Sequence, residues 1–452
     1  MSSPILPASL AGRRTFIKSA AAAGVVLAGW KPTLGQGRAL QKLNVASIGV
    51  GGMGTTDLAQ IASHPEVAIV GLCDTDSNNL GTAKKLHPGA KTFADGREMF
   101  ESLGDGVDAV SITTPDHMHA IYAMTAMNNG KHVYCQKPLA WSVQENRVLA
   151  AAAAANPELA TQMGTQNASR PMKQRCMKFV RDGSLGKIKE VHAWSDRPIW
   201  PQGNPRPEGS DPVPASLSWD LWLGVAPERP YKNNAYHAFA WRGVRDFGCG
   251  ALGDMACHIV DAAFQPLDLG DPTSVICEAT DCTDDQFPSK EVVKMTLAGN
   301  KHSDGEPIPF TWYDGKMLPE ASSMGLPADF SLPQNVVVIV GEKGALMVPQ
   351  GGDGYAYFRK GKQRAMEMPQ ARGGSHWHLW VDRARGGDQP CLTPIEYGGR
   401  VSETLAIGAI ASRFPNQPLE WDAKSMSFPA SPEATAHVAR KYRPGWEVKG
   451  LG

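Results

Sequence analysis

Three side chains of this sequence have the chemistry and the spacing needed to move a proton. Asp254 and His258 are four residues apart in a stretch that we expect to be helical from about Gly253, so they share one helical face. A carboxylate one turn from an imidazole can fix the tautomer of the ring and stabilise its protonated form, as a general acid or base requires. A helix-capping Asp254 beside a structural histidine fits the same spacing equally well. Lys137 is the third candidate, and its alternative is a lysine on a solvated turn.

The element expected to position Lys137 is a buried strand of a parallel sheet. Residues 132–136 form a short run of strand formers that ends immediately before Lys137 and Pro138. Pro138 lacks a backbone donor and therefore helps to stop the strand. In an open parallel sheet, ligands bind outside the carboxyl ends of the strands, so Lys137 is directed at a bound ligand.

A glycine-rich turn indicates what that sheet binds. The pattern G-x-G-x-x-G over 49–54 follows one apolar strand-forming run and opens a helical pattern, and a second apolar run ends at Asp74, twenty residues after the last glycine. This combination is typical of dinucleotide binding: Gly49 makes the turn, Gly51 admits the pyrophosphate and Gly54 lets the helix pack closely. Asp74 would bind the ribose hydroxyls, and the absence of a neighbouring arginine favours NAD over NADP. The alternative is a glycine-rich turn in some other doubly wound sheet.

Other residues expected at the cofactor follow further strands of the same sheet. A buried strand over 109–113 runs into Thr114-Pro115-Asp116, and a later strand over 159–164 precedes Gln166. These turns fall on the edge that carries the glycine turn. The residues expected to bind the cofactor are Gly49, Gly51, Gly52, Met53, Gly54, Asp74, Thr113, Thr114, Pro115, His117, Gln136 and Lys137.

The length of 452 residues is too great for one ordinary core and suggests two or three units. We expect a signal region over 1–40, a dinucleotide-binding domain over 41–168 and an α+β domain over 169–452. The signal prediction rests on Arg13-Arg14, followed by an alanine-rich apolar segment shorter than the ~20 residues of a membrane span. This pattern is typical of twin-arginine export to the periplasm, with no membrane contact after signal removal. The alternative is a disordered basic tail.

The texture of the sequence changes near residue 187. Strand-like runs joined by short turns replace the alternation of strand and helix, and helices without interleaved parallel strands reappear near 375–385 and 401–413. We expect strands near 273–280, 291–298, 308–313, 336–349 and 354–358. This pattern predicts an α+β domain with a largely antiparallel sheet. The loop over 197–234, rich in Pro, Trp and Gly, is unusually long, so we expect it to form a wall of a functional site.

Composition argues against several classes of function. The 45 basic and 45 acidic residues balance, so the sequence shows no electrostatic footprint for nucleic acid. The eight cysteines include no C-x-x-C pair and indicate neither a disulfide framework nor a zinc site. We expect no metal at His376 and His378 either, because alternate residues of a helix diverge, and we interpret them as the start of a surface helix.

These motifs together resemble the Gfo/Idh/MocA family, the relatives of glucose-fructose oxidoreductase and inositol dehydrogenase, over most of residues 43–425. The segments that carry the resemblance are the glycine turn, Thr114-Pro115-Asp116, Lys137-Pro138, Asp254-x-x-x-His258 and Leu419-Glu420-Trp421-Asp422. The resemblance implies a Rossmann domain followed by an open-faced, largely antiparallel sheet that builds the substrate pocket and often the oligomer interface.

The resemblance also implies roles for individual residues. Lys137 would be the active-site lysine, and Asp254 with His258 the proton-relay pair. Gln166 would lie near the nicotinamide, which adds it to the residues expected at the cofactor. One position departs from the family, because Glu-Lys-Pro is usual where this sequence has Gln136-Lys137-Pro138.

These features predict an exported, NAD-dependent oxidoreductase that acts on a secondary hydroxyl of a sugar or cyclic polyol. We expect a tightly retained cofactor, because little free dinucleotide should exist outside the cytoplasm, and a homo-oligomer. Two alternatives remain open. One is a glycoside-cleaving enzyme that works through transient sugar oxidation and elimination, and the other is a redox-inactive protein that binds NAD or a sugar.

Overall fold

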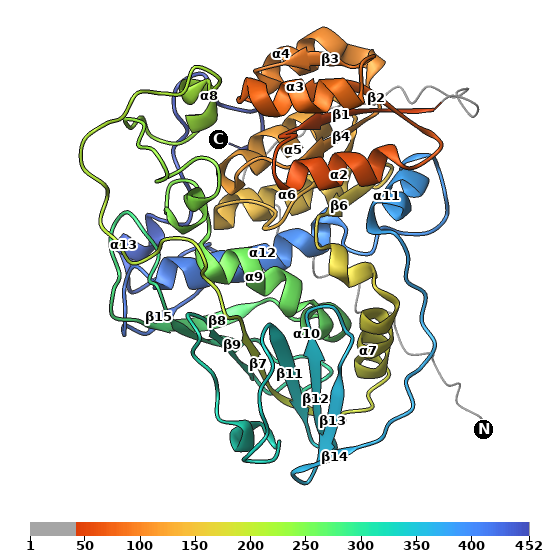
Figure 1. Cartoon of the computed structure of the whole chain (residues 1–452). Helices are drawn as coiled ribbons and strands as arrows, with labels where there is room; N and C mark the ends of the chain where they lie inside the picture. The colour runs from red at the N-terminus through yellow and green to blue at the C-terminus, as the bar shows by residue number, and fades with distance from the viewer. Residues whose placement is uncertain (1–41, 452) are drawn as a thin grey trace, which may run out of the picture. The chain divides into compact units, whose positions relative to one another are not determined.

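The computed structural model describes residues 42–451, so the expected signal region over 1–40 lies outside the described residues. Two β-sheets organise the described part of the chain (Figure 1). The first is formed by strands between residues 43 and 163, and the second by strands between residues 188 and 420.

The first sheet has six strands, all parallel, in the order β3-β2-β1-β4-β5-β6. Its strands are β1 (Leu43–Ile48), β2 (Val67–Cys73), β3 (Lys91–Phe93), β4 (Ala109–Ile112), β5 (His132–Cys135) and β6 (Thr161–Met163). The intervening helices are α2 (Met53–Ala62), α3 (Ser77–Leu86), α4 (Gly96–Leu103), α5 (His119–Asn128) and α6 (Val143–Ala155). This strand order is that of a doubly wound dinucleotide-binding sheet, which confirms the expected Rossmann domain.

The second sheet has nine strands in the order β14-β13-β12-β11-β7-β10-β9-β8-β15. Its strands are β7 (Ile188–Trp194), β8 (Pro272–Glu278), β9 (Val292–Leu297), β10 (Ile308–Tyr313), β11 (Val336–Gly341), β12 (Gly344–Pro349), β13 (Ala356–Arg359), β14 (Lys362–Arg364) and β15 (Leu419–Glu420). Only β7 and β10 pair in parallel, so the largely antiparallel sheet is confirmed. The single run expected over 336–349 is instead the hairpin β11–β12, because the chain turns between Gly341 and Gly344.

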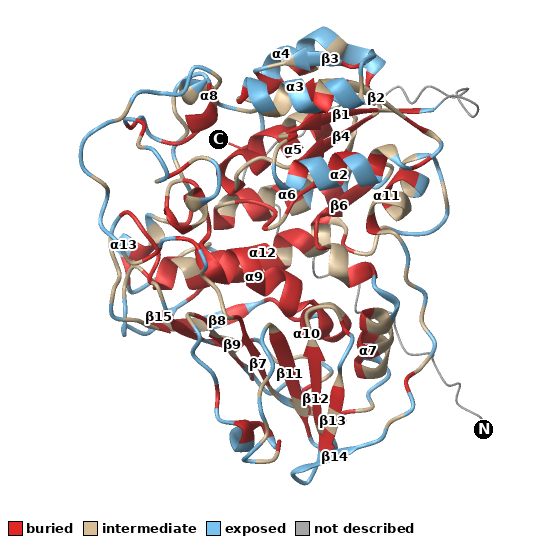
Figure 2. Ribbon diagram, in the orientation of Figure 1, coloured by how far each residue is buried: buried red, intermediate tan, exposed pale blue. Residues whose placement is uncertain are grey.

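Helices of the second region link the two sheets. They are α7 (Pro171–Arg181), α8 (Trp219–Leu223), α9 (Gly250–Ile259), α10 (Asp261–Leu267), α11 (His376–Ala384), α12 (Ile395–Ala411) and α13 (Pro432–Thr435). α12 packs against α6 from the first region and against β8 from the second, and α9 packs against α12 and β7. Every residue of α9 is buried, as Figure 2 shows. A helix that is buried all round places its polar side chains in the interior, where each of them needs a partner.

The long loop between β7 and α9 contacts the first region beside Asp74. It holds a buried aromatic cluster that includes Trp222, Tyr236 and Phe247. The loop extends beyond residue 234, where the sequence predicts its end, and it forms the 3-10 helix η5 (Ala240–Gly243) there. The backbone of Ser218 donates to the Thr75 carbonyl oxygen at 2.9 Å, which brings the loop to the end of β2.

The two histidines of α11 lie apart from each other. Ser375 caps this helix, and His376 is 1% exposed with Nδ1 at 2.6 Å from the Ser169 hydroxyl. The expectation of a surface position is therefore wrong for His376, which the fold buries against η4 (Gln166–Ser169). His378 instead contacts the Ser63 hydroxyl. Within residues 42–451, no group of side chains is arranged to hold a metal ion, and no helix is long and apolar enough to cross a membrane.

Candidate active site

A largely buried ion pair joins the carboxyl end of β5 to α9. The Lys137 ammonium donates to Oδ1 of Asp254 at 2.9 Å and to the Asp254 backbone oxygen at 2.8 Å. Only 14% of the Lys137 side chain and 11% of the Asp254 side chain are exposed. Lys137 is therefore not a lysine on a solvated turn, and the two regions of the chain meet at this pair.

α9 begins earlier than the sequence predicts. Its first residue is Gly250 and its N-cap is Cys249, so Asp254 lies inside the helix and does not cap it. The expected start near Gly253 and the capping alternative for Asp254 are both wrong. The early start carries no sequence signal, because such signals are capping side chains and Cys249 supplies none.

The spacing does place His258 one turn after Asp254 in the same helix. His258 is 8% exposed, and its Nδ1 atom is buried without a hydrogen-bond partner among residues 42–451. A buried polar atom without a partner is costly, so this nitrogen is available to a ligand that enters the site.

The charges of these three groups suit proton transfer. Burial lowers the pKa of His258 well below its usual value and the Lys137 ammonium lowers it further, so the imidazole is neutral at pH 7. Burial opposes ionisation of Asp254, but the cations of Lys137 and Arg242 outweigh it and lower the pKa of the carboxyl. Burial also opposes protonation of Lys137, yet the surrounding groups, Asp254 foremost, raise the pKa of the ammonium. A neutral base therefore lies near an ion pair.

Two further charged groups belong to this cluster, and the sequence alone does not predict a role for either of them. Nε of Arg242, in η5, donates to Oδ1 of Asp254 at 3.3 Å. Asp116, which follows β4, is 3% exposed, and its Oδ2 atom has no hydrogen-bond partner in the described part of the chain. Burial raises the pKa of Asp116 to about 7, against the opposing effect of Lys137. In the sequence, Asp116 has only its place in the Thr114-Pro115-Asp116 motif as a signal, and the only feature that could have pointed to Arg242 is the aromatic residues near it, Phe239 and Trp241.

The glycine turn is shaped to hold a pyrophosphate at the start of α2. Gly49 has a φ of 78°, and a Cβ on it would lie 2.5 Å from the Thr113 carbonyl oxygen. A Cβ on Gly54 would lie 1.9 Å from the Gly49 carbonyl oxygen, whereas Gly52, the N-cap, faces open space. No side chain of the described residues caps this helix end, so its backbone N–H groups can bind an anion. These residues fit the phosphates of a dinucleotide.

Asp74 follows β2 and its carboxylate faces the glycine turn. Oδ2 accepts hydrogen bonds from the backbone N–H groups of Val50 at 2.9 Å and Gly51 at 3.1 Å, and Oδ1 accepts one from Asp76 at 2.9 Å. Burial raises the pKa of this carboxyl, and the backbone donors oppose the shift. The acid is thus fixed beside the turn, where a dinucleotide-binding sheet places the ribose.

The other residues expected at the cofactor divide into two sets. Those that follow strands or open α2 at this edge are Gly52, Met53, Thr113, Thr114, Pro115, Gln136 and Gln166. Oγ1 of Thr114 is buried without a partner in the described part, as suits a hydroxyl that awaits a ligand. The side chain of His117 turns away, because its Nε2 atom contacts the Trp222 carbonyl oxygen at 3.1 Å and its ring packs against Phe247.

Asp57 on α2 accounts for the unusual Gln136. Oδ2 of this fully buried carboxylate accepts from the Gln136 amide and the Thr113 hydroxyl, both at 2.8 Å, and Oδ1 accepts from the Trp377 indole at 2.8 Å. A glutamate at position 136 would set a second carboxylate against Asp57, whereas glutamine supplies a donor. In this chain a buried carboxylate, Asp57, thus lies one hydrogen bond away from the side chain at position 136.

A second buried ion pair supports the end of α9. Lys173 of α7 and Asp261 of α10 are both fully buried, with Nζ and Oδ2 3.6 Å apart. Lys173 also donates to the His258 carbonyl oxygen at 2.5 Å, and the Tyr397 hydroxyl donates to Asp261 at 2.6 Å. This network fixes the backbone of His258.

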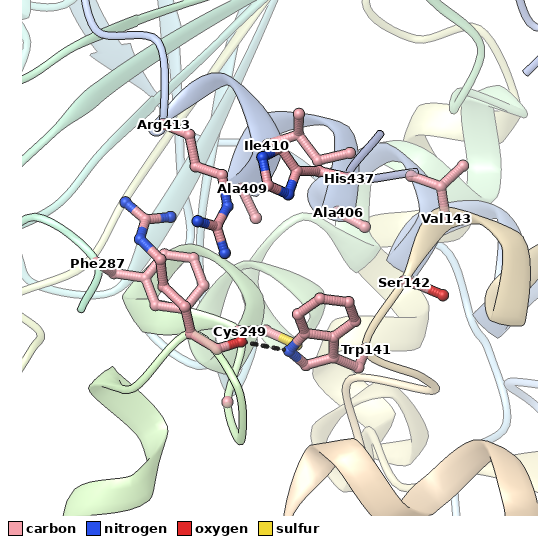
Figure 3. Close-up of a pocket in the computed structure, with 12 residues that line it drawn as sticks. Trp141, Ser142, Val143, Cys249, Phe287, Ala406, Ala409, Ile410, Arg413 and His437 are labelled. Atoms are coloured by element: carbon pink, nitrogen blue, oxygen red, sulfur yellow. Dashed lines mark hydrogen bonds between the residues drawn. The ribbon is translucent and has the colours of Figure 1, made fainter. Parts of the chain in front are cut away.

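A cavity of about 30 Å³ borders the turn that follows Lys137 (Figure 3). Its lining includes Arg245, Arg413 and His437, and the Trp141 indole donates to the Arg245 carbonyl oxygen at 2.8 Å, which is the bond drawn in the figure. Sites for small organic ligands are typically ~300 Å³ or larger, so this cavity is too small for a sugar. It does not compete with the Lys137 cluster as a substrate site.

Two family models match the chain. The model described as "Oxidoreductase family, NAD-binding Rossmann fold" matches residues 43–163, and "Oxidoreductase family, C-terminal alpha/beta domain" matches residues 187–304. Together they match more than half of the chain.

Curated relatives match over about half of their own length. A glycosyl hydrolase family 109 protein of Saccharopolyspora erythraea is 29% identical over 39% of this chain and 44% of the relative. A levoglucosan dehydrogenase of Pseudarthrobacter phenanthrenivorans is 24% identical over 50% of this chain and 51% of the relative. An inositol 2-dehydrogenase of Rubrobacter xylanophilus is 28% identical over 34% and 44%, respectively.

Solved structures share the fold over most of the chain. The WlbA dehydrogenase of Bordetella pertussis, in complex with NADH and UDP-GlcNAcA, has a TM-score of 0.59 at 19% identity and covers 84% of this chain and 99% of its own. The aldose-aldose oxidoreductase of Caulobacter crescentus has a TM-score of 0.55 at 17% identity, with coverage of 84% and 100%. With both family models, the two-sheet fold and the glycine turn in agreement, the chain belongs to the Gfo/Idh/MocA oxidoreductase family.

Proposed function

We propose that this protein oxidises or reduces a secondary hydroxyl of a sugar or cyclic polyol with bound NAD. The observation that carries the proposal is the cluster of Lys137, Asp254 and His258 at the carboxyl edge of a sheet built for a dinucleotide. Dehydrogenases of inositol and levoglucosan among the relatives support a polyol or sugar substrate.

Each side chain has a part in the proposed reaction. The dinucleotide, when bound, supplies the acceptor for the hydride. Neutral His258 accepts the hydroxyl proton, and the nearby carboxylate of Asp254 stabilises the imidazolium that forms. The Lys137 ammonium donates a hydrogen bond to the oxygen as it gains negative charge. Asp254 keeps this ammonium in place.

Steady NADH formation by the purified protein with a panel of free sugars and inositols tests the proposal. We expect turnover with at least one of them in the presence of NAD. Binding of NAD without turnover on any member of the panel would favour the redox-inactive alternative instead.

We further propose that Asp74 selects NAD over NADP. Its carboxylate is fixed at the glycine turn by three backbone donors, and a 2′-phosphate at the same place would face its charge. Titration of the protein with both dinucleotides should give the lower Kd for NAD. Tighter binding of NADP would contradict this assignment.

A second candidate function is glycoside cleavage through transient oxidation of the sugar, elimination of the aglycone and return of the hydride. The observation in its favour is the similarity to a glycosyl hydrolase family 109 protein. The two functions differ in their net redox change. Release of 4-nitrophenol from aryl glycosides without accumulation of NADH would support cleavage.

We also propose that the protein is exported with its cofactor bound. The proposal rests on Arg13-Arg14 and the apolar segment after it, which lie outside the described residues. A cofactor held with micromolar affinity, worth ~8 kcal/mol, would be lost on dilution outside the cytoplasm. Protein purified from the periplasm of its host should therefore contain stoichiometric NAD(H). Protein that is purified empty and needs millimolar NAD would contradict retention.

A further inference from the structure

We propose that the substrate is a sugar acid and that Arg242 binds its carboxylate. This inference rests on the proposed function and narrows its substrate class. It is carried by the position of Arg242 beside the Lys137–Asp254 pair, by the donors that Arg242 leaves unused, and by the surplus of positive charge around it.

Arg242 is held in place by aromatic rings beside the Lys137–Asp254 pair. The carbon of its guanidinium lies 4.5 Å from the ring centre of Phe239, 4.4 Å from that of Trp241 and 5.9 Å from that of Trp200. The Arg242 side chain is 21% exposed, and Phe239 is 48% exposed. The rings orient the guanidinium in advance, so little conformational entropy is lost when it binds a ligand.

The hydrogen bonds of Arg242 leave part of its guanidinium free. Nε donates to Oδ1 of Asp254 at 3.3 Å, and Nη1 donates to the Phe239 carbonyl oxygen at 3.3 Å. A guanidinium has five N–H donors, and within residues 42–451 no protein acceptor bonds to Nη2. Arg242 thus retains N–H donors for a ligand. Only the Asp254 carboxylate, which both cations contact, separates the guanidinium from the Lys137 ammonium.

The charges around this point do not balance. Lys137 and Arg242 are both cationic and both bond to the same oxygen of Asp254. His258 is neutral, because burial and the Lys137 ammonium lower its pKa. Asp116 is only partly ionised at neutral pH, because burial raises its pKa to about 7. An anionic group on the substrate would compensate the excess positive charge in a site where water does so poorly.

A carboxylate fits these features better than a neutral hydroxyl does. The planar guanidinium matches a carboxylate through two parallel hydrogen bonds, and such charge-assisted bonds are about twice as strong as neutral ones. The exposed ring of Phe239 offers an apolar surface to the face of a sugar beside that carboxylate.

Matched pairs of acid and neutral sugar test the inference. We would measure binding of D-glucuronate against D-glucose, and of D-galacturonate against D-galactose, to the NAD-saturated protein by calorimetry, together with initial rates of NADH formation. D-Glucose 6-phosphate completes the panel. We expect at least one acid to bind ~10-fold or more tightly than its neutral partner, as for a hydrogen bond between charged groups. Equal affinities within each pair, binding of neither acid, or preference for the phosphate ester would overturn the inference.

Variants separate substrate selection from a merely structural role. Arg242→Gln should reduce the acid-to-neutral ratio of kcat/KM to about 1, whatever loss both substrates share through the contact of Arg242 with Asp254, and Arg242→Lys, which keeps the charge, should give an intermediate ratio. A merely structural role would lower both members of a pair equally and leave the ratio at its wild-type value, and that unchanged ratio would contradict the inference. The control is Lys232→Gln in the same loop, which removes a cation that contacts Asp211 instead, and it should leave the ratio unchanged.

These measurements distinguish failure of the sugar-acid inference from failure of the proposed function. If neutral sugars reduce NAD and acids do not bind, the proposed function stands and the sugar-acid inference fails. If an acid binds through Arg242 without NADH formation from any sugar, the carboxylate-binding role of Arg242 stands and the proposed oxidoreductase function fails.

Discussion

The two sheet regions position their functional groups by different physical means. In the first region, the glycine turn follows β1 and Lys137 follows β5. Both are parallel strands of one sheet, with β4 between them, so their shared direction brings the turn and the lysine to one edge. In the second region, Asp254 and His258 lie inside a buried helix whose end is supported by the Lys173–Asp261 ion pair. Backbone topology thus holds one half of the site, and buried charges hold the other. Perturbing each half should therefore have different consequences.

The largest effect is expected from removing the proposed catalytic groups, because this tests whether the two halves form a single site. Lys137→Ala and His258→Ala should each reduce kcat/KM by ~10²- to 10⁴-fold, because each removes a group that acts on the reacting oxygen or its proton. The double variant should be little worse than the poorer single variant, since groups that act as a unit are not additive. The measurement is NADH formation with the best substrate.

The control for these variants is His302→Ala, a partly exposed histidine of the second region. It should keep normal turnover. If Lys137→Ala also kept near-normal turnover with an intact fold and bound dinucleotide, the groups of the two regions would not form a single active site.

The next effect concerns the buried charges of the second region. Lys173→Met leaves Asp261 buried without its cation, which should lower the free energy of unfolding by about 3–5 kcal/mol. Lys178→Met in the same helix removes a half-exposed lysine paired with Asp182 and should cost less than about 0.5 kcal/mol. Urea denaturation measures both.

A companion variant identifies the cause of the loss. Lys173→Met combined with Asp261→Asn removes both charges and keeps an acceptor for the Tyr397 hydroxyl, so it should recover part of the lost stability. If Lys173→Met is no more harmful than Lys178→Met, buried charge does not hold this half of the site.

The difference between the two regions also explains which parts of the site could be predicted from the sequence. The glycine turn, Asp74 and Lys137 follow from local patterns plus the rule that parallel strands share a carboxyl edge, and the Asp254–His258 spacing follows from helical periodicity. The contacts of Asp57 with Trp377, which are 320 positions apart, follow no period and have no local signal. For the same reason, the ion pair of Lys173 and the place of Arg242 emerge only from the folded chain.

A smaller effect should appear where the two regions meet, at Asp116. Its pKa is raised to about 7 in the folded protein, so its protonated form favours folding, and this contribution is lost as pH rises from its unfolded value through about 7. Asp116→Asn cannot ionise. The variant should therefore gain stability relative to the wild type between about pH 4 and pH 8, by at most about 4 kcal/mol, and the difference should be flat outside that window. Denaturation curves across this range measure it, and a constant difference would contradict the assignment.

The smallest effect tests the first region's own buried carboxylate. Gln136→Glu sets a second carboxylate against Asp57 at a site where the amide now donates at 2.8 Å, and it should cost about 1–3 kcal/mol of folding free energy. Asp57→Asn alone leaves the Thr113 and Trp377 donors facing an uncharged group and should cost a similar amount. Gln136→Glu combined with Asp57→Asn restores one carboxylate and one amide in exchanged positions, so the double variant should be more stable than the sum of the two single losses predicts. It also recreates the Glu-Lys-Pro sequence that is usual in the family. If the double-mutant cycle gives a coupling energy near zero, Asp57 is not the group that requires glutamine at position 136, and the first region owes its geometry to backbone topology alone.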